Sequence, residues 1–311
     1  MLPPLNTLYH TRAMRIVFFG MPGRLAGPAL LALLGAGAEL AAVVVPAPPG
    51  APPVAPAPLS IMPANVIALG PAAPPGLLAI AAARRLPVLA VRSMGTPAVR
   101  EALVNLAPEL VCVACWPWRI PPVLLAVPRL GWLNLHPSPL PELRGPEPLF
   151  WALQAGHAHT AVTLHWMDEG LDTGDIAAAA PFALPAGISW VEAEEQAAAT
   201  GAALLAALLP RLVAGGSPRH PQAAGGSYRP SPCAEDFRID TSWPAERAFR
   251  FMRGTAAWGM SYPLELGGTR LLLGAALGFM PDEQLGQPVI VSGDVARVQM
   301  QPGVLRARLA V

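Results

Sequence analysis

Short runs of consecutive apolar residues alternate with stretches of helical composition over most of the first two thirds of the chain. The apolar runs predict buried strands at Arg15–Gly20, Leu40–Val45, Pro87–Val91, Leu110–Ala114, Trp132–Leu135 and Ala161–Trp166. The stretches between them predict helices at Leu25–Leu34, Leu77–Arg85, Pro97–Leu106 and Pro148–Ala155. This alternation is typical of an α/β fold, so we expect a Rossmann-like, mostly parallel sheet covered on both faces. Ligands of such sheets bind beyond the carboxyl ends of the strands.

The pattern changes after residue 208. Residues 209–230 are rich in Gly, Pro and Ser and predict a linker. A helix is expected at Pro244–Met252, followed by short alternating runs separated by Gly-containing turns, which are typical of a small β-barrel. We therefore expect four segments: a disordered extension (1–13), an α/β domain (14–208), the linker (209–230) and a C-terminal β-barrel-like domain (231–311).

Composition limits the chemistry. Hydrophobic residues make up 53% of the 311 residues, which is enough for a large core. All 21 basic residues are Arg, so a lysine nucleophile, a Schiff-base lysine and a P-loop lysine are excluded. The formal net charge of +1 gives no global electrostatic reason to bind nucleic acid.

The cysteines and apolar segments bear on the compartment. Three cysteines, two of them in the C-x-x-C pair Cys112 and Cys115, argue against a disulfide scaffold and favour a reducing cytoplasm. A zinc or redox half-site is the alternative for that pair, but two small apolar residues in a buried strand are favoured. Residues 40–83 carry no charge, yet their eleven prolines are incompatible with a spanning helix. No transmembrane segment or secretory signal is predicted.

Two segments carry candidate chemistry. Asn134 and His136 stand two apart at the end of a predicted strand, so their side chains share one face. An amide donor beside an imidazole suits a reaction that builds an oxyanion and moves protons, although a structural histidine is the usual explanation of an isolated pair. The loop 167–176 holds four carboxylates and two glycines. A carboxylate near His136 would raise the pKa of that histidine. A solvated acidic turn is the alternative, and the spacing does not fit an EF-hand calcium loop.

Together, the motifs NLH, SPLPELRG and GLDTGD resemble the signature of the formyltransferase family that uses 10-formyltetrahydrofolate. The opening MRIVFFGMP and the segment HTAVTLHWMDEGLDTGDI extend the resemblance. The later segment DFRIDTSWPAERAFRFMRG is similar to the C-terminal domain of the methionyl-tRNA formyltransferase members, to which the chain is most similar. The resemblance covers roughly residues 14–311.

The resemblance implies a mechanism and its residues. Protonated His136 and the Asn134 amide would stabilise the oxyanion formed when a primary amine attacks the formyl group of 10-formyltetrahydrofolate. Asp172 would hold His136 in its charged form and help to relay a proton to the leaving nitrogen. No metal is implied. The resemblance places the folate against Trp118, Arg119, Ile120, Pro121, Met167, Asp168, Gly170 and Leu171. It places the acceptor against Ser138, Leu140, Pro141, Arg144, Gly145 and an arginine stripe formed by Arg247, Arg250 and Arg253.

The acceptor stays open at this stage. The chain departs from the family at Pro139, and its loop Pro46–Pro63 is uncharged where the methionyl-tRNA members carry a basic loop that contacts tRNA. Residues 231–311 have eight Arg against eight acidic residues and are neutral. Initiator methionyl-tRNA is the leading acceptor. The alternatives are an amino-sugar nucleotide or another small amine, water in a 10-formyltetrahydrofolate hydrolase, and a non-catalytic folate-binding protein. No membrane and no obligate protein partner are inferred.

The remaining aromatic and imidazole side chains have simpler explanations. His157, His159 and His165 lack the carboxylate or Cys spacing of a metal site, so they are expected to be structural. Trp116 and Trp118 are the two indoles expected to face the folate.

Overall fold

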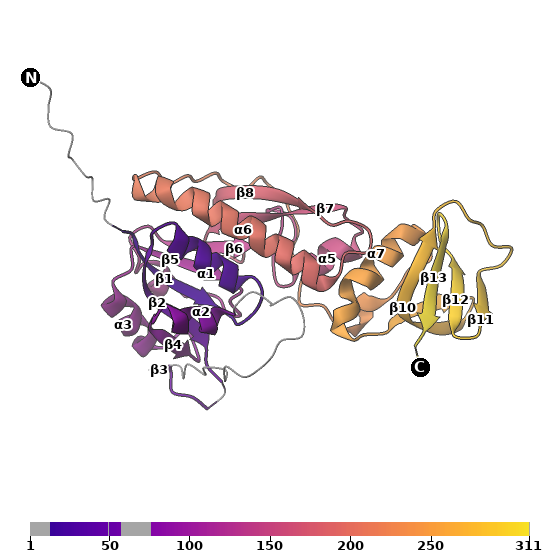
Figure 1. Ribbon diagram of the computed structural model, residues 1–311, viewed down its shortest axis with the longest axis horizontal. Helices are drawn as coiled ribbons and strands as arrows, with labels where there is room; N and C mark the ends of the chain where they lie inside the picture. The colour runs from indigo at the N-terminus through magenta and orange to yellow at the C-terminus, as the bar shows by residue number, and fades with distance from the viewer. Residues whose placement is uncertain (1–12, 49, 57–75, 311) are drawn as a thin grey trace, which may run out of the picture.

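The computed structural model describes residues 13–48, 50–56 and 76–310. These residues form an N-terminal α/β domain and a C-terminal antiparallel domain (Figure 1). Residues 1–12 of the expected disordered extension (1–13) and residues 57–75, which include the end of the predicted Pro-rich loop, lie outside the described residues.

Eight strands form the large sheet, in the order β3–β4–β2–β1–β5–β6–β7–β8. Their bounds are β1 Arg15–Gly20, β2 Glu39–Pro46, β3 Val54–Pro56, β4 Val88–Val91, β5 Leu110–Ala114, β6 Trp132–His136, β7 His159–Trp166 and β8 Ile176–Ala183. The five strands from β4 to β6 are parallel, whereas β3, β7 and β8 pair antiparallel with their neighbours. The Rossmann-like prediction is therefore confirmed. The short strand β3 lies within the predicted Pro-rich loop, at the sheet edge where proline is tolerated.

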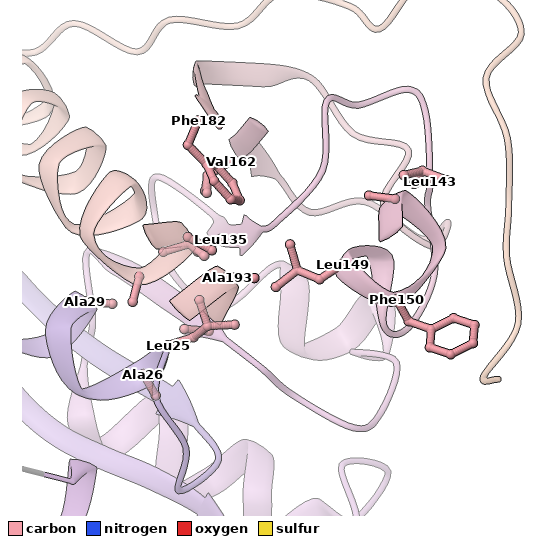
Figure 2. Close-up of a cluster of buried hydrophobic side chains, with 14 of the residues drawn as sticks. Leu25, Ala26, Ala29, Leu135, Leu143, Leu149, Phe150, Val162, Phe182 and Ala193 are labelled. Atoms are coloured by element: carbon pink, nitrogen blue, oxygen red, sulfur yellow. The ribbon is translucent and has the colours of Figure 1, made fainter. Parts of the chain in front are cut away.

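Six helices accompany this sheet in the described residues. Their bounds are α1 Ala26–Gly35, α2 Leu77–Ala83, α3 Pro97–Leu106, α4 Pro122–Leu125, α5 Pro148–Gln154 and α6 Trp190–Val213. Two apolar clusters form, because alternate residues of the central strand β1 point to opposite faces: Ile16 and Phe18 enter one cluster, Val17 and Phe19 the other. Figure 2 shows part of the first cluster, where Leu135 of β6 lies with residues of α1, α5 and α6.

The long helix α6 packs on the sheet and approaches Leu135 of β6. It begins with a capping box in which the Ser189 hydroxyl accepts from the Glu192 amide and the Glu192 carboxylate accepts from the Ser189 amide. A Cβ at Gly201 would lie 2.3 Å from Leu135 Cδ1, so a larger residue there would displace the Leu135 side chain. By length and hydropathy α6 could cross a membrane, but its buried residues pack against α1, β7 and β8. It therefore serves here as a core helix.

Of the C-x-x-C pair, Cys112 lies in a buried strand, as the sequence analysis favours. Cys112 is buried in β5 and Cys115 follows the end of that strand. Burial raises the pKa of each of these two thiols to about 12, so neither is activated as a nucleophile. All three cysteines are free.

The C-terminal domain is a five-stranded antiparallel sheet in the order β11–β12–β13–β10–β9, which confirms the predicted β-barrel-like domain. Its strands are β9 Tyr262–Leu266, β10 Thr269–Met280, β11 Val289–Ser292, β12 Val295–Gln299 and β13 Val304–Leu309, and its helices are η1 Ala234–Phe237, α7 Ala245–Thr255 and η2 Ala256–Trp258. Helix α7 packs against β10 and β13 on one side and α5 on the other (Figure 1).

An aromatic cluster joins the two domains. Phe150 of α5 stacks edge-on against Phe237 and Phe251, at centroid distances of 5.1 and 5.5 Å. Trp258 lies 5.2 Å from the same ring. A Cβ at Gly254 would lie 2.7 Å from Leu153 Cδ1, so α7 approaches α5 closely. The domains therefore share one continuous core.

The segment 209–230, predicted as a linker, is bound to the α/β domain. Its first residues belong to α6, which ends at Val213. Further along, His220 pairs with Ile176, and Tyr228 pairs with Arg144, as isolated β-bridges. The segment thus runs along the α/β domain and reaches the loops at the carboxyl end of β6.

Candidate active site

The candidate site lies at the carboxyl end of β6, where the sheet topology predicts ligands to bind. Asn134 and His136 lie on one face of this strand, as their spacing predicts. Strand β7 pairs antiparallel with β6 in a register that sets His165 opposite Asn134. The Asn134 Nδ2 atom lies 3.0 Å from His165 Nε2.

Asp172 joins these side chains from the loop after β7. Its Oδ1 lies 3.5 Å from Asn134 Nδ2 and 3.4 Å from His165 Nε2, and its Oδ2 accepts a 2.9 Å hydrogen bond from the Gly145 amide. Burial raises the pKa of the Asp172 carboxyl, but the two imidazoles and the Gly145 amide outweigh it and lower that pKa to about 2. Asp172 is therefore a carboxylate at neutral pH.

His136 is almost fully buried beside Asp172. Its Nε2 donates to the Leu143 carbonyl at 3.0 Å, which leaves Nδ1 with a lone pair 3.7 Å from Asp172 Oδ2. Burial lowers the pKa of His136 below its ordinary value, and the opposing effects of Asp172 and the Leu143 carbonyl do not restore it. Burial therefore opposes the charged form of His136, whereas Asp172, as the sequence analysis expects, favours it.

His165 is the site member that the sequence analysis missed. Its Nδ1 donates to the Trp166 carbonyl at 3.2 Å, and its Nε2 lies 3.0 Å from Asn134 Nδ2 and 3.4 Å from Asp172 Oδ1. The sequence predicts it to be structural, together with His157 and His159. Among the described residues, no group of three His, Cys, Asp or Glu side chains could hold a metal ion. The missing signal was the pairing register of two strands thirty residues apart.

The loop after β6 is held by its own hydrogen bonds. Ser138 is fully buried and its hydroxyl donates to the Glu142 carbonyl at 2.7 Å. The Thr163 hydroxyl of β7 donates to the Ser138 carbonyl and accepts from the Leu140 amide. The Leu140–Pro141 peptide bond is cis. Ser138, predicted to contact the acceptor, is thus committed to fixing the loop that carries Leu143 and Gly145.

Gly145 and Arg144 end this loop. Gly145 has φ +99°, and a Cβ there would lie 2.2 Å from the Arg229 carbonyl oxygen, so only glycine fits. The Arg144 guanidinium, predicted to bind the acceptor, donates instead to Gln222 of the segment 209–230. The structure therefore brings a third, unpredicted segment to the site.

The structure brings together the two segments expected to hold the folate. Arg119, in the segment before α4, donates to the Glu169 carbonyl of the loop 167–172. Trp118 packs edge-on against Trp116 at 5.4 Å. In the same region Ile120 is buried and Pro121 caps α4.

The loop 167–172 is also ordered by local bonds. The Met167 amide donates to the Trp132 carbonyl, and the Asp168 carboxylate accepts from the Gly170 amide and the Thr173 hydroxyl. Leu171, in the same loop, is 42% exposed. An apolar side chain is thus available to a ligand at this edge.

The arginine stripe lies away from these loops, on α7. Arg247 donates to the Gln154 carbonyl at 2.8 Å and stacks over Trp243 at 3.9 Å. Arg250 pairs with Glu246 at 2.6 Å and donates to the Leu184 carbonyl. Only Arg253 of the three is exposed. The stripe is therefore not a uniform solvent-facing surface, because two of its members bind the α/β domain.

Similar sequences cover almost the whole chain. A family model described as formyl transferase matches residues 15–206. The methionyl-tRNA formyltransferase of Chloroflexus aurantiacus is 32% identical over 306 residues, which cover 94% of this chain and 94% of that protein.

Solved structures share the fold across both domains. The N-formyltransferase from Helicobacter canadensis, in complex with folinic acid and dTDP-3-aminofucose, superposes with a TM-score of 0.66 at 13% identity, covering 94% of this chain and 98% of that one. The methionyl-tRNA formyltransferase from Clostridium thermocellum gives a TM-score of 0.53 at 14% identity, covering 96% and 99%. The family model spans more than half of the sequence, and the chain belongs to the formyl transferase family.

Proposed function

We propose that this protein transfers the formyl group of 10-formyltetrahydrofolate to the amino group of methionyl-tRNA. One observation carries the proposal: at the carboxyl end of β6, the Asp172 carboxylate lies 3.5 Å from the Asn134 amide and 3.7 Å from the His136 imidazole, and all three residues stand in the family motif. The 32% identical relative along almost the whole chain is named for this reaction and acceptor, which favours methionyl-tRNA.

The proposed roles follow from the hydrogen bonds. Neutral His136 accepts a proton from the attacking amine at Nδ1, because its Nε2 hydrogen is already bound by the Leu143 carbonyl. Asp172, 3.7 Å away, stabilises the imidazolium that forms. The imidazolium then gives the proton to N10 of the folate as the bond between N10 and the formyl carbon breaks. Asn134 has one N–H held by His165 and a second held only weakly by Asp172 at 3.5 Å. That second N–H is the donor proposed for the developing oxyanion.

The residues near Trp118 fit a folate. The indole Nε1 of the neighbouring Trp116 is buried and has no hydrogen-bond partner among the described residues. An unpaired buried donor is costly unless a ligand satisfies it. The folate supplies the formyl group. The segment 118–121 and the loop 167–172, joined through Arg119, are proposed to hold it, with no metal.

Formyl transfer by purified protein from 10-formyltetrahydrofolate to methionyl-tRNA tests the proposal. We expect formylated tRNA, and a His136→Ala variant that loses about 100-fold to 10,000-fold in rate while remaining folded. An acceptor-free reaction measures hydrolysis separately. Folate turnover without tRNA formylation would contradict the acceptor, and no turnover at all would contradict the chemistry.

A second acceptor, a small amine such as an amino-sugar nucleotide, is favoured by the state of the arginine stripe. Arg247 and Arg250 are bound at the domain junction, and the described part of the loop 46–63 carries no basic residue. A protein that binds tRNA through phosphates loses affinity steeply with salt, whereas a small-amine enzyme does not. Measuring KM for methionyl-tRNA over a range of salt concentrations separates the two.

We propose a cytoplasmic location, as expected for an enzyme that uses aminoacylated tRNA. The three free cysteines support a reducing compartment. Separation of cytoplasmic and membrane fractions from cells that express the protein tests this, and recovery in the membrane fraction would contradict it.

A further inference from the structure

Gln222 lies in the segment 209–230, far in sequence from the motifs of the site, and its amide is fully used by two site loops. Its Nε2 donates to the Asp172 carbonyl at 2.7 Å and to the Gly174 carbonyl at 2.8 Å. Its Oε1 accepts from the Arg144 guanidinium at 2.7 Å through Nη2 and at 3.2 Å through Nε. One side chain therefore joins the loop after β6 to the loop after β7.

The bonds of Gln222 complete a ring around Asp172. The Gly145 amide, next to Arg144, donates to the Asp172 carboxylate, while Gln222 holds the Asp172 carbonyl. The Arg144 backbone is bound in turn by the Ser227 carbonyl and the Arg229 amide. Both the carboxylate and the main chain of Asp172 are thus fixed relative to the loop that carries Leu143, the partner of His136.

Asp172 needs such support because its backbone is strained. It has φ +55°, in the left-handed region that non-glycine residues adopt at a cost of about 1–3 kcal/mol. Two residues further along, a Cβ at Gly174 would lie 1.7 Å from the Trp166 carbonyl oxygen, so no side chain fits at this position of the turn. A strained residue keeps its conformation only where its surroundings hold it.

We propose that Gln222 is a positioning residue for formyl transfer: it locks the Asp172 loop to the Arg144 loop and so sets the distance between Asp172 and His136. This inference rests on the proposed function. Gln222 itself touches neither His136 nor Asn134 in the bonds described above. Gln222 therefore acts through Asp172, and we expect its loss to lower kcat rather than the affinity for the folate.

The test uses two substitutions and a matched control in the full-length protein. Gln222→Ala removes all four bonds, whereas Gln222→Glu keeps the acceptor for Arg144 and loses the two donors to the Asp172 loop. Gln287→Ala is the same chemical change at an exposed position in the loop between β10 and β11. Each protein is compared for kcat and KM with methionyl-tRNA, and the imidazole of His136 is titrated by NMR.

We expect both Gln222 variants to lower kcat by about tenfold to a hundredfold with little change in KM for the folate, and Gln287→Ala to match the wild type. Water that enters the loosened site should also raise the pKa of His136 toward its ordinary value in both Gln222 variants. If Gln222→Ala does not fold, Gln222→Glu alone decides.

Two results would overturn the inference: a folded Gln222 variant with wild-type kcat, or one in which His136 titrates as in the wild type. A wild-type protein without turnover would defeat the proposed function instead. In that case the NMR titration, which needs no substrate, still decides whether Gln222 holds the site.

Discussion

Two pairs of regularly spaced polar residues have opposite surroundings in this molecule. Asn134 and His136, two apart on β6, meet Asp172 and His165 in a buried site. Arg247 and Arg250, three apart on α7, bind carbonyls of the α/β domain. On a strand, the two-residue period alone decides which side chains share a face. On a helix between two domains, both sides can be buried, so spacing does not tell which residues reach solvent.

Asp172→Asn is expected to give the largest effect and tests the β6 side of this comparison directly. The amide keeps the size of the side chain but cannot stabilise an imidazolium, so kcat should fall by about 100-fold to 10,000-fold. Single-turnover formyl transfer measures this. Asp175→Asn, in the same loop, is the control and should stay near the wild-type rate. Equal rates for Asp172→Asn and the wild type would remove Asp172 from the mechanism.

Gly201→Ala tests how the strand is held in place. The added Cβ would meet Leu135, which lies between Asn134 and His136, so we expect a loss of about 1–3 kcal/mol in unfolding free energy. Denaturant titration gives the value. The same change at Gly35, where a Cβ meets nothing within 4 Å, should instead be neutral or slightly stabilising. A Gly201→Ala variant as stable as the wild type would show that the close approach of α6 to Leu135 does not matter for stability.

Acidification should lower the free energy of unfolding through the titratable groups of the site. The pKa of Asp172 is about 2 in the folded protein and 3.8 in the unfolded chain, so its contribution of roughly 2 kcal/mol is present above pH 3.8 and is lost toward pH 2. The pKa of His136 is also lower when folded, so stability begins to fall below pH 6.5 as the unfolded chain takes up protons first. Unfolding free energies of the wild type and Asp172→Asn between pH 7 and pH 2 measure both. An acid-linked loss of the same size in Asp172→Asn would contradict this account of the carboxylate.

Arg250→Ala tests the α7 side and should give the smallest effect. It removes the bonds to Glu246 and to the Leu184 carbonyl, for an expected loss of about 1–2 kcal/mol in stability with little change in folate turnover. Arg253→Ala, at the exposed end of the stripe, should change stability by less than about 0.5 kcal/mol. Thermal unfolding compares the pair. If Arg250→Ala instead lost tRNA affinity while remaining stable, Arg250 would be a residue that contacts the acceptor.

The parallel part of the sheet could be predicted because its strands are continuous apolar runs. Strands β1 and β5 and helix α3 have the predicted bounds. Strand β8 was not predicted, because its sequence IAAAAPFA is mostly Ala and shows no alternation of bulky apolar and polar residues. The small side chains of Ala do not signal burial, and the strand is defined by its pairing with β7.

The motif residues of the site could be predicted, but their environment could not. The charge state of His136 depends on burial, which a motif does not reveal. That His165 belongs to the site follows only from the register of β6 with β7, which sets it opposite Asn134. Gln222 sits among glycines and prolines that favour a linker, and nothing in that composition shows that its amide reaches two loops. These are consequences of tertiary structure rather than of local pattern.

The aromatic cluster around Phe150 has a consequence for how the molecule unfolds. Phe237, Phe251 and Trp258 come from the C-terminal domain, yet they cover a helix that belongs to the α/β domain. Loss of either domain would expose these rings, so neither can melt without a penalty in the other. Scanning calorimetry should therefore show one cooperative transition, and amides of α5 and α7 should exchange with solvent at similar, slow rates.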